Sequence, residues 1–252
     1  MQRVLSLTRK CIAEYKMIKN GDVIGVGVSG GKDSVMTLLA LAELRRFYTE
    51  KFDIKAITID SDPGKSDFSE IKELCARHNI EYSIVESNIF EIIFDIRKEE
   101  NPCSLCAKMR RGMLHDEALR LGCNKIALGH NFNDAVETFL MSQIYEGRIS
   151  CFSPVTYLDR KGLWQIRPLL YVDEYLIRRT VRRFDLPIVK NTCPANGNTK
   201  RQEIKEFVAK MNSAYPGYST KIFNAMQRLP LAGWEILDKD PRRSAKKTKE
   251  TD

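Results

Sequence analysis

The chain has 252 residues, of which 43% are hydrophobic and 29% charged, a composition typical of a folded globular protein. It has no run of about 18 apolar residues and no uninterrupted apolar segment near its start, which argues against a membrane span and a secretion signal, so we expect a cytoplasmic protein with no membrane partner. Lysine and arginine number 41 against 33 acidic residues, and the net charge of +8 favours a polyanionic partner such as nucleic acid.

The predicted elements alternate between helices and strands. An amphipathic helix is expected over residues 1–20, where apolar residues recur every three or four positions. Strands are then predicted at 22–29, 53–60, 81–86 and 124–130, and helices at 33–47, 66–79, 103–121 and 133–147. This order predicts an α/β fold, a parallel sheet with helices on both faces. Ligands bind outside the carboxyl ends of such strands, where Ser29–Ser34, Asp60 and Gly129–Asp134 lie.

The pattern loosens after residue 150. A strand leading into a turn is predicted at 162–170, and helices are predicted at 173–187, 199–212 and 218–227. We therefore expect an N-terminal helix (1–20), a main α/β domain (21–195), short C-terminal helices (196–230) and a tail (239–252). The tail is rich in lysine and arginine, and we expect it to be disordered.

Two familiar glycine patterns overlap in residues 22–34, and neither fits. The GxGxxG match at 25–30 fails because its first two glycines lie inside the predicted strand. The GxxxxGK[ST] loop fails because Val26 occupies the place of its first glycine. Asp33 also stands where that loop needs a serine or threonine to bind Mg²⁺.

A third pattern, SGGKDS, joins the first predicted strand to a helix and consists of Ser29, Gly30, Gly31, Lys32, Asp33 and Ser34. Its glycines let the backbone approach a phosphate closely, and the start of a helix presents free N–H groups and a positive dipole. Lys32 adds a positive charge, and Asp33 beside an anion suits a ligand of Mg²⁺. The structural alternative is a tight turn closed by an Asp or Ser cap.

Cysteines supply a second motif. Cys103 and Cys106 form a C-x-x-C pair at the start of a predicted helix, a position that lowers the pKa of a thiol. Spacing alone leaves a metal or cluster site, a redox dithiol and two inert thiols open. Cys193 precedes another predicted helix, and three thiolates would leave one open position on a tetrahedral metal or a [4Fe–4S] cluster. The cysteines at 11, 75, 123 and 151 are expected to be small buried hydrophobic residues.

With these motifs in view, the chain resembles the tRNA 2-thiocytidine-forming sulfurtransferases, the TtcA family of PP-loop N-type ATP pyrophosphatases. The matching segments cover most of residues 20–230 in the family's order. They are SGGKDS, PCSLCAKMRRG, GHNFNDAVETFLM, IRPLLYVDE, the segment from Cys193 to KRQEIK, and YPGYSTKIFNAMQRL.

The resemblance implies an ATP-dependent tRNA sulfurtransferase. In the family the SGGKDS loop grips the β- and γ-phosphates of ATP, and AMP is transferred to the substrate with release of pyrophosphate. By resemblance, Arg110, Gly129 and Asp134 line the ATP site. The three cysteines 103, 106 and 193 hold a [4Fe–4S] cluster that carries sulfur. The resemblance further implies cytidine 32 of tRNA as the target, a sulfur donor (a cysteine desulfurase or sulfide) and a homodimer. Three residues after the position of Cys193 the family often has a further cysteine, and this chain has Asn196 there.

The segment GHNFNDAVETFLM also carries candidate site residues of its own. Asp134 could hold Mg²⁺ or move a proton, and His130 could touch phosphate or substrate. The alternatives are a helix-dipole partner for Asp134 and a packing histidine for His130. Glu137 is expected to be structural, and Arg167 to approach substrate or phosphate.

Three rival functions remain at this point. A thiouridine-forming relative would use the same chemistry, although such relatives often carry extra cysteine pairs that this chain lacks. An amide-forming pyrophosphatase would need no three-cysteine site. A nucleotide-binding regulator would show no turnover.

Overall fold

The structure is a computed structural model that describes residues 1–99, 102–190, 193, 200–228 and 234. The predicted tail at 239–252, the boundary at 195–196 and Asn196 lie outside the described residues. The division into domains therefore stays a prediction. Among the described helices, none is both long and apolar enough to cross a membrane.

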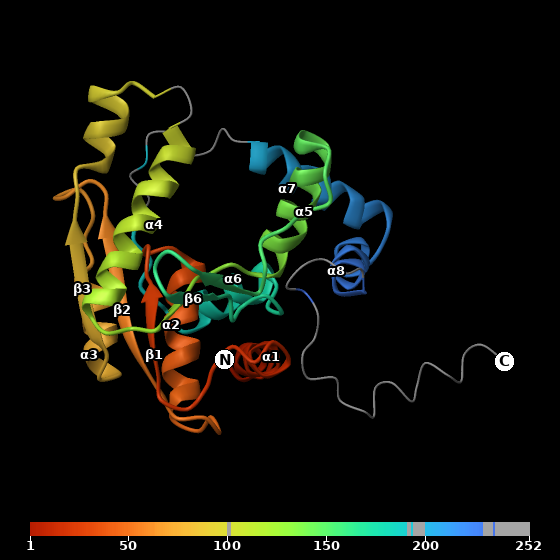
Figure 1. Ribbon diagram of the computed structural model, residues 1–252. Helices are drawn as coiled ribbons and strands as arrows, with labels where there is room; N and C mark the ends of the chain where they lie inside the picture. The colour runs from red at the N-terminus through yellow and green to blue at the C-terminus, as the bar shows by residue number, and fades with distance from the viewer. Residues whose placement is uncertain (100–101, 191–192, 194–199, 229–233, 235–252) are drawn as a thin grey trace.

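One six-stranded sheet forms the centre of the molecule, with the order β3-β2-β1-β4-β6-β5 (Figure 1). Its strands are β1 (Asp22–Gly27), β2 (Phe52–Asp60), β3 (Glu81–Glu86), β4 (Lys125–Ala127), β5 (Val155–Leu158) and β6 (Leu163–Ile166). Neighbouring strands pair in parallel, except that β5 runs antiparallel to β6 at the edge. The predicted α/β fold is confirmed, and the antiparallel edge strand β5 was not predicted.

Helices follow most strands, as the sequence pattern predicted. They are α1 (Gln2–Glu14), α2 (Lys32–Arg45), α3 (Ser69–Arg77), α4 (Pro102–Arg120), α5 (Phe132–Glu146), α6 (Glu174–Arg183), α7 (Lys200–Ala214) and α8 (Tyr218–Arg228). A π-helical segment, η1 (Glu91–Ile96), precedes α4 and was not predicted. In Figure 1, α5, α7 and α8 lie together to one side of the sheet.

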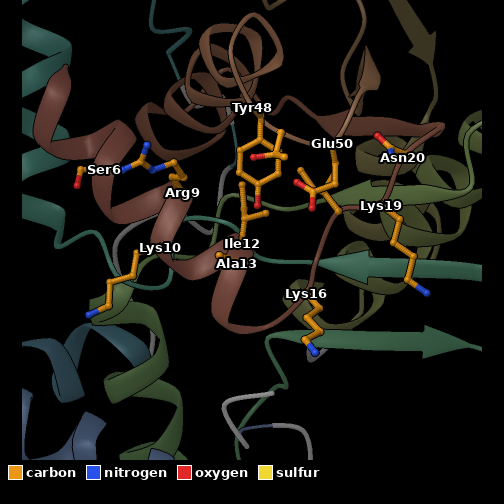
Figure 2. A pocket seen from close by; sticks show the side chains of 12 residues that line it. Ser6, Arg9, Lys10, Ile12, Ala13, Lys16, Lys19, Asn20, Tyr48 and Glu50 are labelled. Carbon is orange, nitrogen blue, oxygen red and sulfur yellow. The ribbon is translucent and has the colours of Figure 1, made fainter. Parts of the chain in front are cut away.

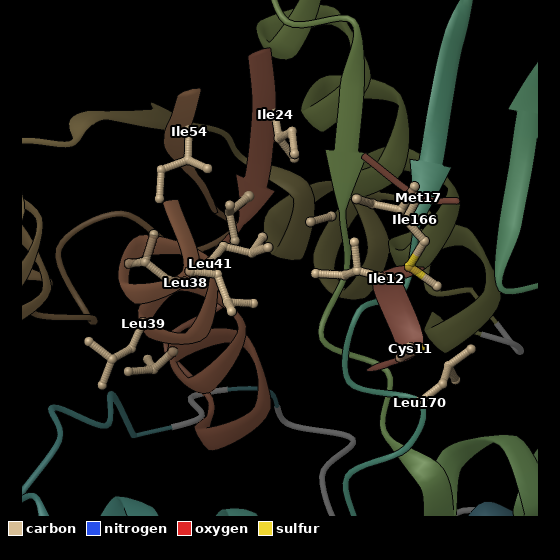
Figure 3. Close-up of a cluster of buried hydrophobic side chains, with 14 of the residues drawn as sticks. Cys11, Ile12, Met17, Ile24, Leu38, Leu39, Leu41, Ile54, Ile166 and Leu170 are labelled. Carbon is tan, nitrogen blue, oxygen red and sulfur yellow. The ribbon is translucent and has the colours of Figure 1, made fainter. Parts of the chain in front are cut away.

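The two faces of the sheet carry separate hydrophobic clusters, because successive side chains of a strand point to opposite faces. Along β2, Ile54 and Ala56 join the cluster that includes α2, and Figure 3 shows Ile54 beside Leu38 and Leu41 of that helix. Ile57 and Ile59 join the cluster that includes Leu114 of α4. Helices α2 and α4 therefore cover opposite faces.

The two glycines inside β1 serve packing. A Cβ atom at Gly27 would lie 3.0 Å from Cδ2 of Leu114, and one at Gly25 would lie 3.4 Å from Cβ of Ala118. Both contacts are with α4, which lies close to β1 because these positions lack side chains. The location of Gly25 and Gly27 within β1 confirms that they are not a dinucleotide-binding turn.

Candidate functional site

The SGGKDS loop runs from the end of β1 to the start of α2. Gly30 has a φ of 80°, a conformation that glycine adopts without strain. The backbone N–H of Val189 donates to the Gly30 carbonyl at 3.0 Å. The Ser34 hydroxyl accepts from the Ser29 N–H at 3.1 Å and donates to the Gly31 carbonyl at 2.8 Å. Hydrogen bonds to Ser34 therefore hold the loop together, and Val189, which is distant in sequence, holds it from another segment.

The first turn of α2 is open to an anion. Within the part of the chain that the structure describes, no side chain caps α2, whose N-cap is Gly31. By contrast, the side chain of Asn131 caps α5 and that of Asp173 caps α6. The N–H groups of a first helical turn have no partner within the helix. Those of α2 therefore offer a phosphate site, which argues against the alternative of an Asp- or Ser-capped turn.

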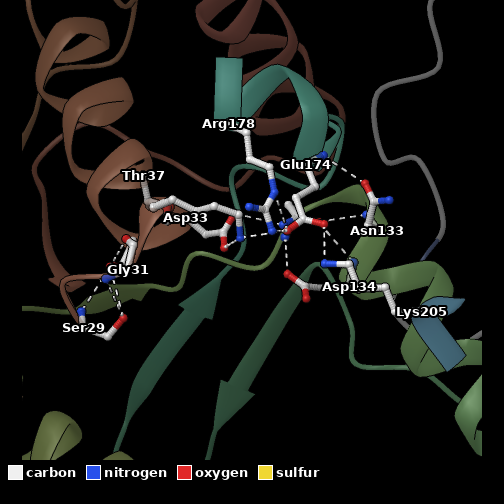
Figure 4. A network of polar contacts seen from close by, with 12 residues as sticks. Ser29, Gly31, Asp33, Thr37, Asn133, Asp134, Glu174, Arg178 and Lys205 are labelled. Carbon is white, nitrogen blue, oxygen red and sulfur yellow. Dashed lines mark hydrogen bonds and ion pairs between the residues drawn. The ribbon is translucent and has the colours of Figure 1, made fainter. Parts of the chain in front are cut away.

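Lys32 belongs to a polar network at the mouth of the loop. Figure 4 shows Asp33 and Glu174 of this network. Its Nζ lies 2.7 Å from Oδ2 of Asp33 and 3.0 Å from Oε1 of Glu174. Oδ1 of Asp33 accepts from the side-chain amide of Asn131 at 3.0 Å. Burial opposes the charged form of Lys32, but the hydrogen bonds and charges of Asp33 and Glu174 outweigh it, so its pKa is raised. Lys32 is therefore a fixed cation beside the open end of α2.

Glu174 is a residue that the sequence interpretation missed. Besides Lys32, its carboxylate binds Lys205 of α7 at 2.6 Å and Arg178 of α6 at 2.7 Å. Burial disfavours the charge of Glu174, but the hydrogen bonds from Lys205, Lys32 and Arg178 are stronger together and hold its pKa at about 2. Its signal in the sequence was its place at the end of IRPLLYVDE, at the start of a predicted helix. It was missed because an acid is common at a helix start and the sequence does not show which residues it pairs with.

Gly129 supports the loop from behind. A Cβ atom there would lie 2.8 Å from the carbonyl carbon of Asp33 and 2.9 Å from the backbone nitrogen of Ser34. The segment that follows β4 therefore contacts the loop backbone directly, and a residue with a Cβ atom at position 129 fits only if that backbone moves. Gly129 also lines the cavity beside the loop.

A cavity of about 650 Å³ opens beside the loop. Its polar lining residues are Ser29, Asp33, Ser34, Arg110, Arg111, His130, Gln165, Arg167 and Arg201. The four arginines make this a cationic cavity that suits a polyanionic ligand. A neighbouring cavity of about 190 Å³ shares Ser29 and Arg110 with it and is also lined by Asp60. The structure therefore places Asp60 in the adjoining cavity.

His130 and Arg167 both contact the ring of Phe152. The rings of His130 and Phe152 are 4.7 Å apart, and the Arg167 guanidinium lies 4.8 Å from the Phe152 ring centre. Burial, with repulsion from Arg167, Arg201 and Arg111, lowers the pKa of His130 to about 3. His130 is therefore a neutral imidazole at physiological pH. Its position agrees with both the packing and the ligand-contact interpretations, because it lines the cavity as well.

Asp134 has a structural role of its own. Its Oδ2 accepts from the Asn131 N–H at 2.9 Å, and the Asn131 side chain accepts from the N–H of Asp134 at 3.1 Å, which forms a capping box at the start of α5. Oδ1 accepts from Arg201 at 3.2 Å. These contacts match the helix-terminus alternative, and the catalytic assignment of Asp134 stays a prediction. Burial raises the pKa of Asp134. Burial also raises the pKa of Glu137, to about 7.

The fold brings the three candidate cysteines near one another. Cys103 and Cys106 lie one turn apart at the start of α4, and the thiolate forms of both Cys103 and Cys193 would raise the pKa of the Cys106 thiol. Burial, the largest effect, raises the pKa of Cys106, and Arg110 opposes it only in part. The expectation of a lowered pKa at this helix start is therefore wrong for Cys106. Among the described residues, no three Cys, His, Asp or Glu side chains stand in metal-coordinating geometry.

The remaining cysteines follow the sequence interpretation with one difference. Cys11, Cys75 and Cys123 are buried, as predicted. Cys151 is half-buried, and its thiol donates to the Ala135 carbonyl at 3.5 Å.

Comparison with known proteins decides the family. Residues 4–212 match the PP-loop domain family. The tRNA-cytidine(32) 2-sulfurtransferase of Dechloromonas aromatica is 35% identical over 224 residues, covering 88% of this chain and 78% of the relative. The protein of that name from Saccharophagus degradans is 37% identical over 237 residues, covering 91% of this chain and 76% of the relative. The chain belongs to the tRNA-cytidine(32) 2-sulfurtransferase family of PP-loop proteins.

A solved structure agrees with this family at the level of the fold. The U34-tRNA thiolase NcsA from Methanococcus maripaludis, determined with its [4Fe–4S] cluster, superposes with a TM-score of 0.75 at 23% identity. The match covers 98% of this chain and 87% of that protein. The resemblance predicted from SGGKDS and the cysteine motif is confirmed, and the PP-loop of this family member is the loop described above.

Proposed function

We propose that this chain is an ATP-dependent tRNA sulfurtransferase that replaces the 2-oxygen of cytidine 32 with sulfur. The observation that carries the proposal is the position of Arg110 on α4. Arg110 lines both cavities beside the PP loop, and its charge acts on the thiol of Cys106. This supports a proposed nucleotide site and a proposed three-thiol site that share one side chain, as two consecutive steps on one base require.

In the first step, ATP is the substrate and the PP loop holds its β- and γ-phosphates. The cytidine O2 attacks the α-phosphorus, a new O2–P bond forms, and the bond to the bridging oxygen of pyrophosphate breaks. Lys32 and the open N–H groups of α2 stabilise the charge that develops on pyrophosphate. Asp33 is the proposed ligand of Mg²⁺, because its carboxylate lies beside Lys32 at the mouth of the loop.

In the second step, sulfur forms a bond to C2 while the C2–O2 bond breaks and AMP leaves with that oxygen. The cationic cavity retains the anionic leaving group, through Arg110, Arg111, Arg167 and Arg201. His130 is neutral and cannot add to this charge, so we assign it contact with the base or ribose.

Cys103, Cys106 and Cys193 are the proposed ligands of a [4Fe–4S] cluster. Three soft thiol donors from two distant segments suit such a cluster, and their mutual influence at Cys106 supports a shared site. When bound, the cluster supplies an iron with an open position that holds sulfide. A cysteine desulfurase or sulfide as sulfur donor and a homodimeric assembly also belong to this proposal.

The test is a tRNA-thiolation assay under anaerobic conditions after reconstitution with iron and sulfide. We expect AMP and pyrophosphate release that depends on a tRNA with cytidine at position 32, and 2-thiocytidine in its digest by mass spectrometry. The same transcript with uridine at 32 is the matched substrate control. Equal turnover on both transcripts would contradict the assigned base, and no AMP release with either would contradict an adenylating enzyme.

Cys193→Ala and Cys151→Ala separate a proposed ligand from a cysteine outside the proposed site. We expect Cys193→Ala to lose about four irons per chain and thiolation, whereas Cys151→Ala keeps both. Wild-type iron content in Cys193→Ala would remove Cys193 from the ligand set.

A further inference from the structure

The outer face of α6 is basic from Arg178 to the end of the helix. At 100° per residue, the side chains of Tyr175, Arg178, Arg179, Arg182 and Arg183 fall within an arc of about 140°. All five are exposed, and Tyr175 is 74% exposed. The opposite side of the helix is buried and includes Ile177 and Val181. The arginines thus form a continuous stripe on an amphipathic helix.

Little negative charge offsets this stripe. The sequence of α6, EYLIRRTVRR, contains four arginines and one acid, and that acid, Glu174, is turned inward to Lys32 and Lys205. Arg178 shares Glu174, and among the described residues Arg179, Arg182 and Arg183 have no acidic partner. Helix α7 differs, because its sequence KRQEIKEFVAKMNSA interleaves both signs. The charge of α6 therefore suits a polyanion more than an ordinary solvated helix face does.

The helix is held against the nucleotide site at both ends. At its start, Glu174 contacts Lys32 of the PP loop at 3.0 Å. The backbone N–H of Glu174 also donates to the Asn133 side chain at 2.9 Å, and Figure 4 shows these two residues side by side. Beyond its end, the Val189 N–H returns to the Gly30 carbonyl at 3.0 Å. With a rise of 1.5 Å per residue, the stripe extends about 12 Å from Tyr175 to Arg183. The stripe therefore begins one residue after Glu174, the residue of α6 that contacts the PP loop.

We propose that the outer face of α6 is the surface on which the tRNA stem and loop dock, an inference that rests on the proposed function. Arg179, Arg182 and Arg183 bind phosphates of the backbone, which position the RNA without reading sequence. Tyr175 directly follows Glu174, which contacts Lys32 of the PP loop. Its exposed ring stacks on an unpaired base, the usual mode of recognising RNA loops. The target base is then directed toward the cavity beside Lys32.

A second basic surface provides the control. A cavity of about 930 Å³ is lined by α1 and by residues that precede β1 and β2, at the amino ends of the strands and away from the PP loop. Figure 2 shows Arg9, Lys10, Lys16 and Lys19 at this cavity together with Glu50. Arg9 and Lys19 are exposed, as the α6 arginines are. Replacing both by glutamine changes the net charge by the same amount as replacing two α6 arginines.

The experiment measures the affinity of the full chain for a tRNA transcript with cytidine 32 as a function of salt. The α6 variant is Arg179→Gln with Arg182→Gln, and the control is Arg9→Gln with Lys19→Gln. Two lost phosphate contacts predict a salt slope smaller by about 1.4 to 1.8 and therefore about 25- to 60-fold weaker binding at 0.1 M salt. The control is expected to change neither, and ATP binding and urea unfolding are expected to match wild type in both. Tyr175→Ala is expected to weaken tRNA binding without changing the slope.

The outcomes are distinguishable. If wild type binds tRNA and the α6 variant binds equally well, the α6 assignment is wrong and the proposed function stands. If both double variants lose affinity equally, binding follows net charge and the assignment is also wrong. If wild type does not bind tRNA at all, the proposed function fails and the docking surface with it.

Discussion

Gly129→Ala tests whether the segment that follows β4 sets the position of the PP loop. The new Cβ would lie 2.8 Å from the carbonyl carbon of Asp33, whereas ordinary contact begins at 3.4 Å, so the loop must move by about 0.6 Å. The neighbours are backbone atoms of the loop, which cannot rotate away as a side chain does. Overpacking of this kind costs about 1–3 kcal/mol of unfolding free energy.

Catalysis should suffer beyond the loss of stability. A misplacement of 1 Å costs about 100-fold in rate, so a shift of about 0.6 Å predicts roughly a 10- to 20-fold fall in kcat/KM for pyrophosphate release. Binding of ATP should weaken as well, because the displaced backbone carries the N–H groups of α2. The assays are tRNA-dependent pyrophosphate release and urea unfolding on the same preparation.

Gly112→Ala is the matched control. Gly112 lies in α4, and a Cβ atom there would meet nothing within 4 Å. Alanine in a helix is favoured over glycine, so this variant is expected to be more stable by about 0.5–1 kcal/mol with unchanged turnover. Wild-type kcat/KM in Gly129→Ala, or an equal loss in Gly112→Ala, would refute the argument that Gly129 positions the loop.

Three further predictions concern stability and protonation. The pKa of Glu174 is about 2 in the folded protein against an ordinary 4.5, so its charge stabilises the fold by about 3 kcal/mol above pH 4.5. This stabilisation is lost as pH falls toward 2. In urea unfolding, the difference in free energy between wild type and Glu174→Gln should therefore shrink from pH 7 to pH 3. His130 is neutral with a pKa of about 3, so its NMR signals should not titrate between pH 8 and 5. Below pH 6.5 the unfolded chain binds a proton at His130 that the folded protein does not bind, so the free energy of unfolding should fall with pH there. Trp234 is 1% exposed and its indole N–H donates to the Phe152 carbonyl at 3.0 Å, so Trp234→Ala should cost about 3–5 kcal/mol. Trp164→Ala, at a residue that is 43% exposed, should cost much less, and equal losses would contradict the packing argument.

The sequence by itself determined the order of elements and the chemistry of the main motif. Strand alternation, helical periodicity and the glycines of SGGKDS depend on residues next to one another in the chain. The structure accordingly places Gly30 at positive φ and Gly31 at the start of α2. The same locality explains why Cys103 and Cys106 were found together, one turn of α4 apart.

Only the tertiary structure decided which distant residues complete the site. Glu174 reaches Lys32, Val189 fixes Gly30, and Cys193 approaches Cys106, because the sheet order brings the ends of separate segments to one edge. Burial in the tertiary structure also raises the pKa of Cys106. Burial depends on packing from all sides, so the position of Cys106 at a helix start does not by itself set this pKa. Local sequence fixes backbone conformation, whereas ion pairs, burial and pKa follow from the three-dimensional neighbours that no short segment encodes.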